Sequence, residues 1–270
     1  MAEPSAPRPL SPVELGFETI VYEKAPPRAT ITLNRPEVLN AFDFRMLREI
    51  TRACEDASWD DDVRVVVLTG TGRAFCAGAD LRSWGADLLG NSKEYWKWFG
   101  AFKDAHDKLR EIGKPTLARI NGICVGGGNE LQMACDLSVI VDDAYIRHVG
   151  PEHGSVPAGG ATQWLTLMIG ERRAREMILL CEEVPSAQAA EWGLVNAAVP
   201  AAELDAHVDR WVESLLRKLP ETTRYTKTQL NVWRDLAWHT TTTHARDWLA
   251  MSMLGEEAQG AVRAFLARRK

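Results

Sequence analysis

Apolar and polar positions along the first third of the chain predict strands alternating with a helix. Residues 17–22 and 29–33 are short β-rich runs separated by Lys-Ala-Pro-Pro, which predicts a hairpin-like opening. Apolar side chains then recur at the spacing of an amphipathic helix over 42–57. The continuous apolar run 63–68, bounded by Asp and Gly, predicts a buried strand.

The middle of the chain continues this alternation. Residues 84–112 are mainly helical in pattern, 116–120 predict a strand, and 122–128 predict a glycine-rich turn. A helix is expected over 129–134 and a further strand over 137–141. Strands alternating with helices indicate an α/β fold.

The pattern changes near residue 203. Three helical segments follow, with no clear strand between them, at 204–219, 221–236 and 243–266. We therefore divide the chain into a Pro-, Ala- and Ser-rich tail (1–12), a core (13–203) and a helical C-terminal region (204–270). The tryptophans of that region are Trp211, Trp233, Trp238 and Trp248. Such a concentration indicates burial against the core or a neighbouring subunit, and helix packing within one subunit explains it equally well.

The amino-acid composition narrows the classes of protein to which this chain can belong. The chain has 270 residues, of which 46% are hydrophobic and 26% charged, as in ordinary globular proteins. The net charge of −5 provides no chain-wide basic field for nucleic acid. Five scattered cysteines without a CxxC pair indicate reduced thiols in a cytoplasmic protein, with neither disulfides nor a metal site. No apolar run approaches the roughly 18 residues of a membrane span.

Two segments are candidates for chemistry. In 72–81, the small residues Ala77, Gly78 and Ala79 allow a ligand to approach the backbone, although a tight turn would use the same residues. In 121–131, three consecutive glycines lie between a predicted strand and a predicted helix. The N–H groups at such a helix start can bind an anion or a developing oxyanion.

Other glycine-loop functions do not fit the second segment. Its spacing is not G-x-G-x-x-G, and no Lys-Ser/Thr follows the glycines of a phosphate loop. Glu130 follows them within the first helical turn. A carboxylate there either serves the helix dipole alone or faces the same ligand as the glycines.

These segments belong to a set of motifs that occur in order along the chain, at 31–36, 39–41, 74–81, 122–130, 159–163 and 189–195. From about residue 30 to its end, the sequence resembles the enoyl-CoA hydratase/isomerase (crotonase) superfamily. The resemblance implies a spiral core of ββα units and a helical C-terminal region that builds homotrimers or homohexamers. It also implies an acyl-CoA substrate whose thioester carbonyl is held by the N–H groups of Ala79 and Gly127.

The same resemblance suggests which residues contact the substrate. We expect substrate and CoA contacts from Arg35, Ala41, Ala77, Gly78, Asp80, Leu81, Val125, Gly126 and Ser155. Arg28, Arg35 and C-terminal Lys or Arg residues are candidates for the phosphates, and 84–102, with Trp96 and Trp98, for the acyl pocket. No cofactor beyond the CoA moiety of the substrate, and no metal, is expected.

The second catalytic glutamate of the hydratases has no clear counterpart. Ungapped alignment places Gly150 there, and the nearest carboxylate is Glu152, beside His153. The string 150–155 is similar to the Gly-Pro-Lys-x-Gly-Ser stretch of members that open or close rings on CoA thioesters. His153 is a candidate base and Ser155 a candidate carbonyl ligand, with structural roles as the alternatives. For His148, within a β-like run, a structural role is favoured.

Three functions follow from these observations. The first is hydration of an α,β-unsaturated enoyl-CoA, with Glu130 acting on water. The second is carbon–carbon hydrolysis of a cyclic oxo-acyl-CoA through the same oxyanion hole. The third is an RNA-binding or inactive homologue, which the sequence disfavours because the basic clusters at 172–175 and 268–270 are not interleaved with aromatic residues.

Overall fold

The computed structural model describes residues 9–268, so most of the tail predicted at 1–12 lies outside the described residues. Strands β1 (Ile20–Ala25) and β2 (Arg28–Leu33) form the predicted hairpin, with Ile20 opposite Leu33. A short helix, α1 (Pro12–Leu15), precedes them and begins at a capping box between Ser11 and Glu14.

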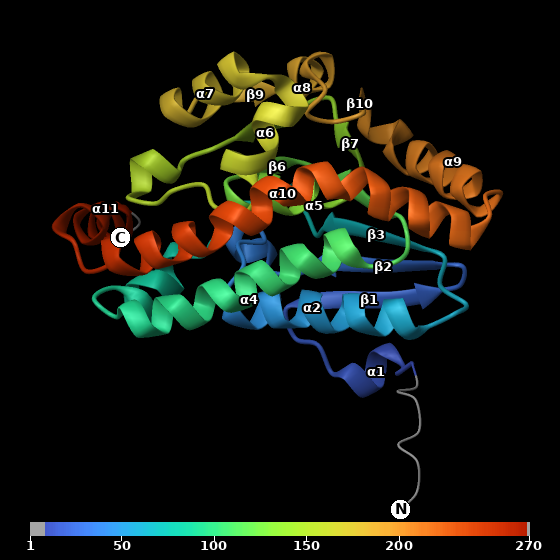
Figure 1. Ribbon diagram of the computed structural model, residues 1–270, viewed down its shortest axis with the longest axis horizontal. Helices are drawn as coiled ribbons and strands as arrows, with labels where there is room; N and C mark the ends of the chain where they lie inside the picture. The colour runs from blue at the N-terminus through green and yellow to red at the C-terminus, as the bar shows by residue number, and fades with distance from the viewer. Residues whose placement is uncertain (1–8, 269–270) are drawn as a thin grey trace, which may run out of the picture.

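The main sheet has six strands, of which Figure 1 labels β1, β2, β3, β7 and β10. Its strand order is β1-β2-β3-β5-β7-β10, and every pair after the hairpin is parallel. The added strands are β3 (Val65–Gly70), β5 (Thr116–Ile120), β7 (Leu137–Val141) and β10 (Ala197–Val199). The predictions of strands at 63–68, 116–120 and 137–141 are therefore confirmed to within two residues.

A second, four-stranded sheet was not anticipated. Its order is β4 (Ala74–Cys76), β6 (Ile123–Val125), β8 (Tyr145–Arg147) and β9 (Val184–Pro185). The expected turn at 122–128 thus contains strand β6, because residues far away in the chain pair with it on both sides. Along the chain, a strand of the main sheet is repeatedly followed by a strand of the second sheet and then by a helix. This order confirms the predicted ββα organisation.

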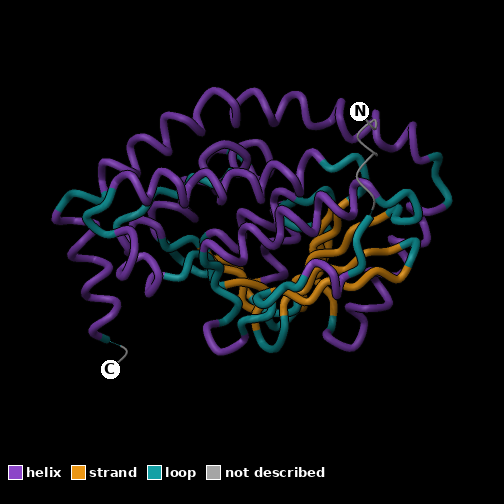
Figure 2. Tube along the Cα trace, turned by 90° about the horizontal axis from the view of Figure 1, so that it is seen from below, coloured by secondary structure: helices purple, strands orange, loops and turns teal. Residues whose placement is uncertain are grey.

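Helices cover these sheets, and Figure 2 shows the strands gathered below a layer of long helices. Those nearest the site are α2 (Phe44–Trp59), α3 (Leu81–Ser83), η2 (Trp84–Leu88), α4 (Ser92–Glu111) and α5 (Gly127–Ala134). Helix α2 begins two residues later than predicted, because the Asp43 side chain accepts a hydrogen bond from Met46 N and caps it. Helix α5 begins earlier than predicted, at Gly127.

The remaining helices lie toward the C-terminus or in short connections: η1 (Pro36–Val38), η3 (Gly150–His153), α6 (Ala161–Ile169), α7 (Glu171–Leu180), α8 (Ser186–Trp192), η4 (Ala201–Glu203), α9 (Leu204–Leu216), α10 (Pro220–Ser252) and α11 (Glu256–Ala267). Helix α10 joins what we expected to be separate helices. In its threonine run, the hydroxyls of Thr240, Thr241 and Thr242 donate to carbonyls four residues back, so they find acceptors within the helix. None of the described helices is both long and apolar enough to cross a bilayer.

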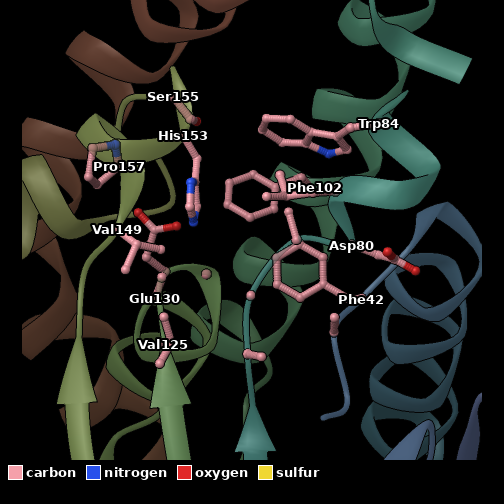
Figure 3. A pocket seen from close by; sticks show the side chains of 18 of the residues that line it. Phe42, Asp80, Trp84, Phe102, Val125, Glu130, Val149, His153, Ser155 and Pro157 are labelled. Carbon is pink, nitrogen blue, oxygen red and sulfur yellow. The ribbon is translucent and has the colours of Figure 1, made fainter. Parts of the chain in front are cut away.

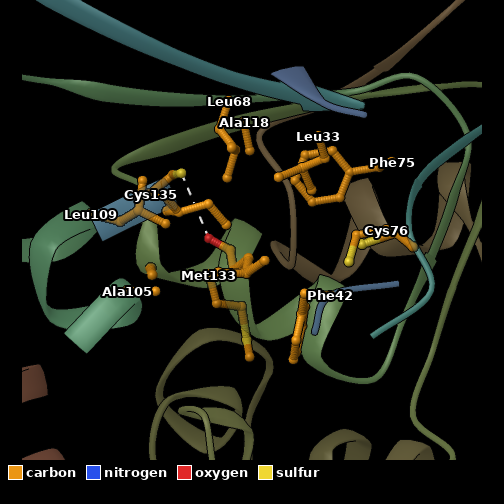
Figure 4. Close-up of a cluster of buried hydrophobic side chains, with 14 of the residues drawn as sticks. Leu33, Phe42, Leu68, Phe75, Cys76, Ala105, Leu109, Ala118, Met133 and Cys135 are labelled. Carbon is orange, nitrogen blue, oxygen red and sulfur yellow. Dashed lines mark hydrogen bonds between the residues drawn. The ribbon is translucent and has the colours of Figure 1, made fainter. Parts of the chain in front are cut away.

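The core lies between the sheets and their covering helices, and Figure 4 shows part of it around Phe42, Phe75 and Met133. Met46, Leu47 and Ile50 of α2 are fully buried, as the helical pattern predicted. All five cysteines are free and buried. Among the C-terminal tryptophans, Trp238 is buried in the core, whereas Trp233 is 71% and Trp248 51% exposed.

Candidate active site

A cavity of about 290 Å³ opens where the carboxyl ends of β4, β6 and β8 meet. Because these strands are parallel neighbours, the segments that follow them come together although they are distant in sequence. The cavity continues between these segments and helices η2 and α4. Figure 3 shows the side chains facing one another across it: Glu130, Val149 and His153 on one side, Phe42, Phe102 and Trp84 on the other.

The segment after β4 presents the N–H group of Ala79 to this cavity. Phe42 N donates to the Gly78 carbonyl at 2.8 Å, and Asp80 N donates to the Phe42 carbonyl at 2.9 Å. Successive peptide groups of an extended segment point in opposite directions, so the Ala79 N–H points away from Phe42. Within residues 9–268, this N–H has no hydrogen-bond acceptor.

The segment after β6 supplies a second free N–H group, that of Gly127, at the start of α5. Gly126 has φ 55° and ψ −120°, a conformation that suits glycine. A Cβ at Gly127 would lie 2.4 Å from Cζ of Phe42, and one at Gly78 would lie 3.0 Å from Gly127 N. The glycines thus bring the two N–H groups close together, as an oxyanion hole requires.

Glu130 lies in the first turn of α5 and lines the cavity, although it is only 4% exposed. Its Oε1 accepts hydrogen bonds from Gly159 N at 2.7 Å and, more weakly, from Ala161 N at 3.4 Å. Burial raises the pKa of Glu130 to about 7, and the two hydrogen bonds oppose the rise. A carboxyl group with that pKa exchanges a proton readily near neutral pH, which suits general acid–base chemistry.

The second catalytic glutamate of the hydratases has no counterpart at this cavity among the described residues; the other carboxylate that lines it, Asp80, is paired with Arg35. Glu152 lies outside it, exposed, and pairs with Arg147 at 2.7 Å. Gly150 lines the cavity, but a Cβ there would lie 2.7 Å from the Ser155 carbonyl oxygen and 3.0 Å from Pro157. The close packing of the 150–157 loop therefore leaves no room for a glutamate side chain at 150.

Most of the other predicted site residues do line the cavity: Ala41, Ala77, Gly78, Asp80, Leu81, Val125, Gly126, His153 and Ser155. His153 also meets the ring of Phe265 edge-to-face, with centroids 5.5 Å apart. Arg35 does not line the cavity, because it donates to the Ala41 carbonyl at 2.7 Å and to Asp80 at 2.9 Å. It therefore ties together two of the segments that line the cavity.

The predicted phosphate ligands are also placed differently. Arg28 is paired at the surface with Asp209, and the last two residues, Arg269 and Lys270, lie outside the described part of the chain. Arg82, which sequence reasoning did not single out, is exposed and lines the cavity. Arg82 is thus a better-placed cation for an incoming phosphate than Arg28 or Arg35.

Aromatic side chains form the wall opposite Glu130. Trp84, Tyr95, Trp98, Phe99 and Phe102 line the cavity, as expected for the 84–102 stretch. Trp98 and Phe102 stack at 5.4 Å with 13° between their planes. Trp96, which we expected to contribute, is 49% exposed outside the cavity and lies beneath the guanidinium of Arg246. Helix α4 turns its side chain away from the site.

Three residues that help to form the site were not predicted from the sequence to do so. Phe42 was placed in a helix but instead pairs with Ala79 and packs beneath Gly127. Gly159 was noted only within a motif, yet it binds the Glu130 carboxylate. His148, for which a structural role was favoured, lines the cavity and is fully buried. The β-like run around His148 was recognised, but only the pairing of β8 with β6 shows that the residue after β8 lies at the cavity.

Comparisons with known proteins agree with this arrangement. The family model described as enoyl-CoA hydratase/isomerase matches residues 28–270. An enoyl-CoA hydratase/isomerase from Xanthobacter autotrophicus Py2 is 31% identical, with 94% of each chain covered and a TM-score of 0.84. An enoyl-CoA hydratase from Mycobacterium avium subsp. paratuberculosis K-10 is 25% identical (93% of this chain, 97% of that one, TM-score 0.84). A monofunctional enoyl CoA isomerase from M. smegmatis is 28% identical (80% and 94%, TM-score 0.69).

Proposed function

The chain belongs to the enoyl-CoA hydratase/isomerase family, and from that premise we propose that it adds water across the α,β double bond of an enoyl-CoA thioester. One observation carries the proposal: a buried carboxyl group with a pKa of about 7 faces the same cavity as two free backbone N–H groups.

The two N–H groups act on the thioester carbonyl. When a nucleophile attacks the β-carbon, the electrons of the double bond move to the carbonyl oxygen and form an enolate. The N–H groups of Ala79 and Gly127 donate to that oxygen more strongly as it gains charge, so they stabilise the transition state more than the bound substrate. The loss of one such donor typically costs about 10²–10³ in rate.

Glu130 moves the proton. In its ionised form it takes a proton from water as the oxygen of that water bonds to the β-carbon. The protonated Glu130 then gives the proton to the α-carbon, and the thioester carbonyl is restored. One carboxylate accounts for both steps, in keeping with the tight 150–157 loop, which leaves no room for a glutamate at 150.

Carbon–carbon hydrolysis of a cyclic oxo-acyl-CoA is the second candidate. It is supported by His153 and Ser155, which line the cavity in the loop that resembles those of ring-opening members. It would use the same two N–H groups, because its intermediate also carries negative charge on the thioester oxygen.

Product analysis in ¹⁸O-labelled water separates these reactions. We expect crotonyl-CoA to yield a 3-hydroxyacyl-CoA that contains one labelled oxygen. A but-3-enoyl-CoA that only moves its double bond would keep its mass and indicate isomerisation, and a labelled carboxylate from a cyclic oxo-enoyl-CoA would indicate ring opening. If no linear enoyl-CoA is converted at micromolar enzyme, hydration is refuted.

A further inference from the structure

His148 is a buried polar side chain at the cavity that the mechanism above does not use. It directly follows β8 and is fully buried. Gly126 N donates to the Arg147 carbonyl at 2.8 Å, so His148 lies beside the oxyanion-hole segment. Its Nδ1 has no hydrogen-bond partner among the described residues, and the residue is one of those that line the cavity.

Two further buried side chains orient this imidazole. Gln132 Nε2 donates to Asn129 Oδ1 at 2.8 Å, which turns the Asn129 amide nitrogen toward His148. Asn129 Nδ2 then donates to His148 Nε2 at 2.9 Å. Because Nε2 accepts in this arrangement, a neutral imidazole carries its hydrogen on Nδ1.

The imidazole stays neutral near pH 7. Burial lowers the pKa of His148 to about 4. The residue is therefore a fixed, uncharged N–H donor and is a poor general base. A buried donor without an acceptor is costly, so a ligand atom that accepts from it would gain the full strength of the hydrogen bond.

We propose that the Nδ1–H group of His148 donates to an oxygen on the acyl group, so that the substrates of this site are acyl-CoA thioesters with an oxo or hydroxyl oxygen beyond the thioester. This inference rests on the proposed function, because it assumes that an acyl-CoA occupies the cavity. The thioester oxygen itself is taken by Ala79, which follows β4, and Gly127, which follows β6, two strands and one strand away from β8. His148 is thus a specificity-determining residue for the part of the acyl group that lies past Glu130.

The opposite wall agrees with a polar acyl group. Trp84 and Trp98 line the cavity, and their Nε1 atoms have no hydrogen-bond partner among the described residues. Trp84 meets Tyr95 and Trp98 edge-to-face, so the aromatic rings offer its N–H a weak alternative. Within residues 9–268 no aromatic ring packs against His148 in this way, so His148 is the sharper test.

Binding to an inactive variant tests this without any need for turnover. In Glu130→Gln protein, dissociation constants are measured by calorimetry for hexanoyl-CoA and its 3-oxo, 4-oxo and 5-oxo derivatives, and for cyclohexanecarbonyl-CoA and its 2-oxo derivative. At least one oxygenated ligand should bind about 5- to 150-fold more tightly than its parent, which is the range for pairing a buried donor. Adding His148→Phe should reduce that ratio to within about twofold, because the oxygenated derivatives lose more affinity than their parents.

Two further variants complete the design. His148→Gln can both accept from Asn129 and donate to the ligand, so it should keep part of the preference. If His148→Phe does not fold, His148→Met removes the donor with a side chain that repacks more easily. The proposal would be overturned if the protein that retains His148 bound every oxygenated derivative no more tightly than its parent. It would also be overturned if the preference for an oxygenated derivative stayed the same in the variants that lack the donor. Equal weakening of parents and derivatives would do the same, because it indicates a structural role. Absence of turnover by the unaltered enzyme would instead count against the proposed reaction and leave the binding result standing.

Discussion

Neutralising Glu130 should stabilise the protein, and the gain should depend on pH. Glu130 has a pKa of about 7 in the folded protein, against an ordinary value of 4.5. The folded state therefore holds this proton more tightly than the unfolded state does. Stability contributed by the protonated group is present below pH 4.5 and is lost as the pH rises to about 7.

The magnitude follows from the two pKa values. A tenfold difference in proton affinity is worth about 1.4 kcal/mol, so ionising Glu130 costs the folded state roughly 3 kcal/mol above pH 7. Glu130→Gln is neutral at every pH and retains an oxygen that can accept from Gly159 N. The variant should match the unaltered protein near pH 4.5 and exceed its stability by about 3 kcal/mol at pH 8.

Urea unfolding at fixed protein concentration, at pH 5 and pH 8, measures this difference. Glu152→Gln is the matched control: it removes a carboxylate that is exposed and outside the cavity, so its effect should stay within about 0.5 kcal/mol at both pH values. A Glu130→Gln variant that is no more stable at pH 8 than at pH 5, relative to the unaltered protein, would refute the burial argument.

Three other predictions follow from the site and the surface. kcat/KM should rise with pH through a midpoint near 7, because Glu130 must be ionised to take a proton from water; a pH profile that is flat from 5.5 to 8.5 would contradict this role. Gly127→Ala should lower kcat/KM by about 10²–10³, because its Cβ would meet the Phe42 ring at 2.4 Å and displace the N–H donor; the half-buried helical Gly100, whose Cβ would meet nothing within 4 Å, provides the control Gly100→Ala, which should remain active. Light scattering should give the mass of a trimer or hexamer, because Leu230, Trp233 and Leu236 of α10 are each at least 58% exposed and an apolar surface of this kind is typical of a subunit interface. Trp233→Glu should produce smaller species, and a monomeric unaltered protein would contradict the expectation.

Local patterns predicted β3, β5 and β7 of the main sheet because these strands are largely apolar runs bounded by turn residues, whereas the short edge strand β10 was not predicted. β3 is buried along its whole length, which is why Val65–Gly70 stands out in the sequence. The second sheet was missed for the opposite reason. β6 has only three residues beside the glycines, and it exists because β4 and β8, from distant parts of the chain, pair with it.

The residues of the candidate site also divide into those that local motifs revealed and those that depend on contacts between distant parts of the chain. Glu130, Ala79 and Gly127 were found because they belong to motifs that resemble a known family. Phe42, Gly159 and His148 contribute through contacts with residues at least 19 positions away. Such contacts leave no periodic signal along the chain. The ion pair that holds Glu152 outside the cavity is likewise invisible to alignment, which could only mark Glu152 as the nearest carboxylate.

The most direct test of the account is a comparison of Glu130→Gln and Glu152→Gln in one steady-state assay with an enoyl-CoA. The account predicts that Glu130→Gln lowers kcat by about 10²–10⁴, while the dissociation constant for a saturated acyl-CoA changes by no more than about threefold, since less than 1 kcal/mol of binding is at stake. Glu152→Gln should retain nearly full activity. Near-full activity in Glu130→Gln, or loss of activity in Glu152→Gln, would show that the catalytic carboxylate is not the one buried beside the two N–H groups.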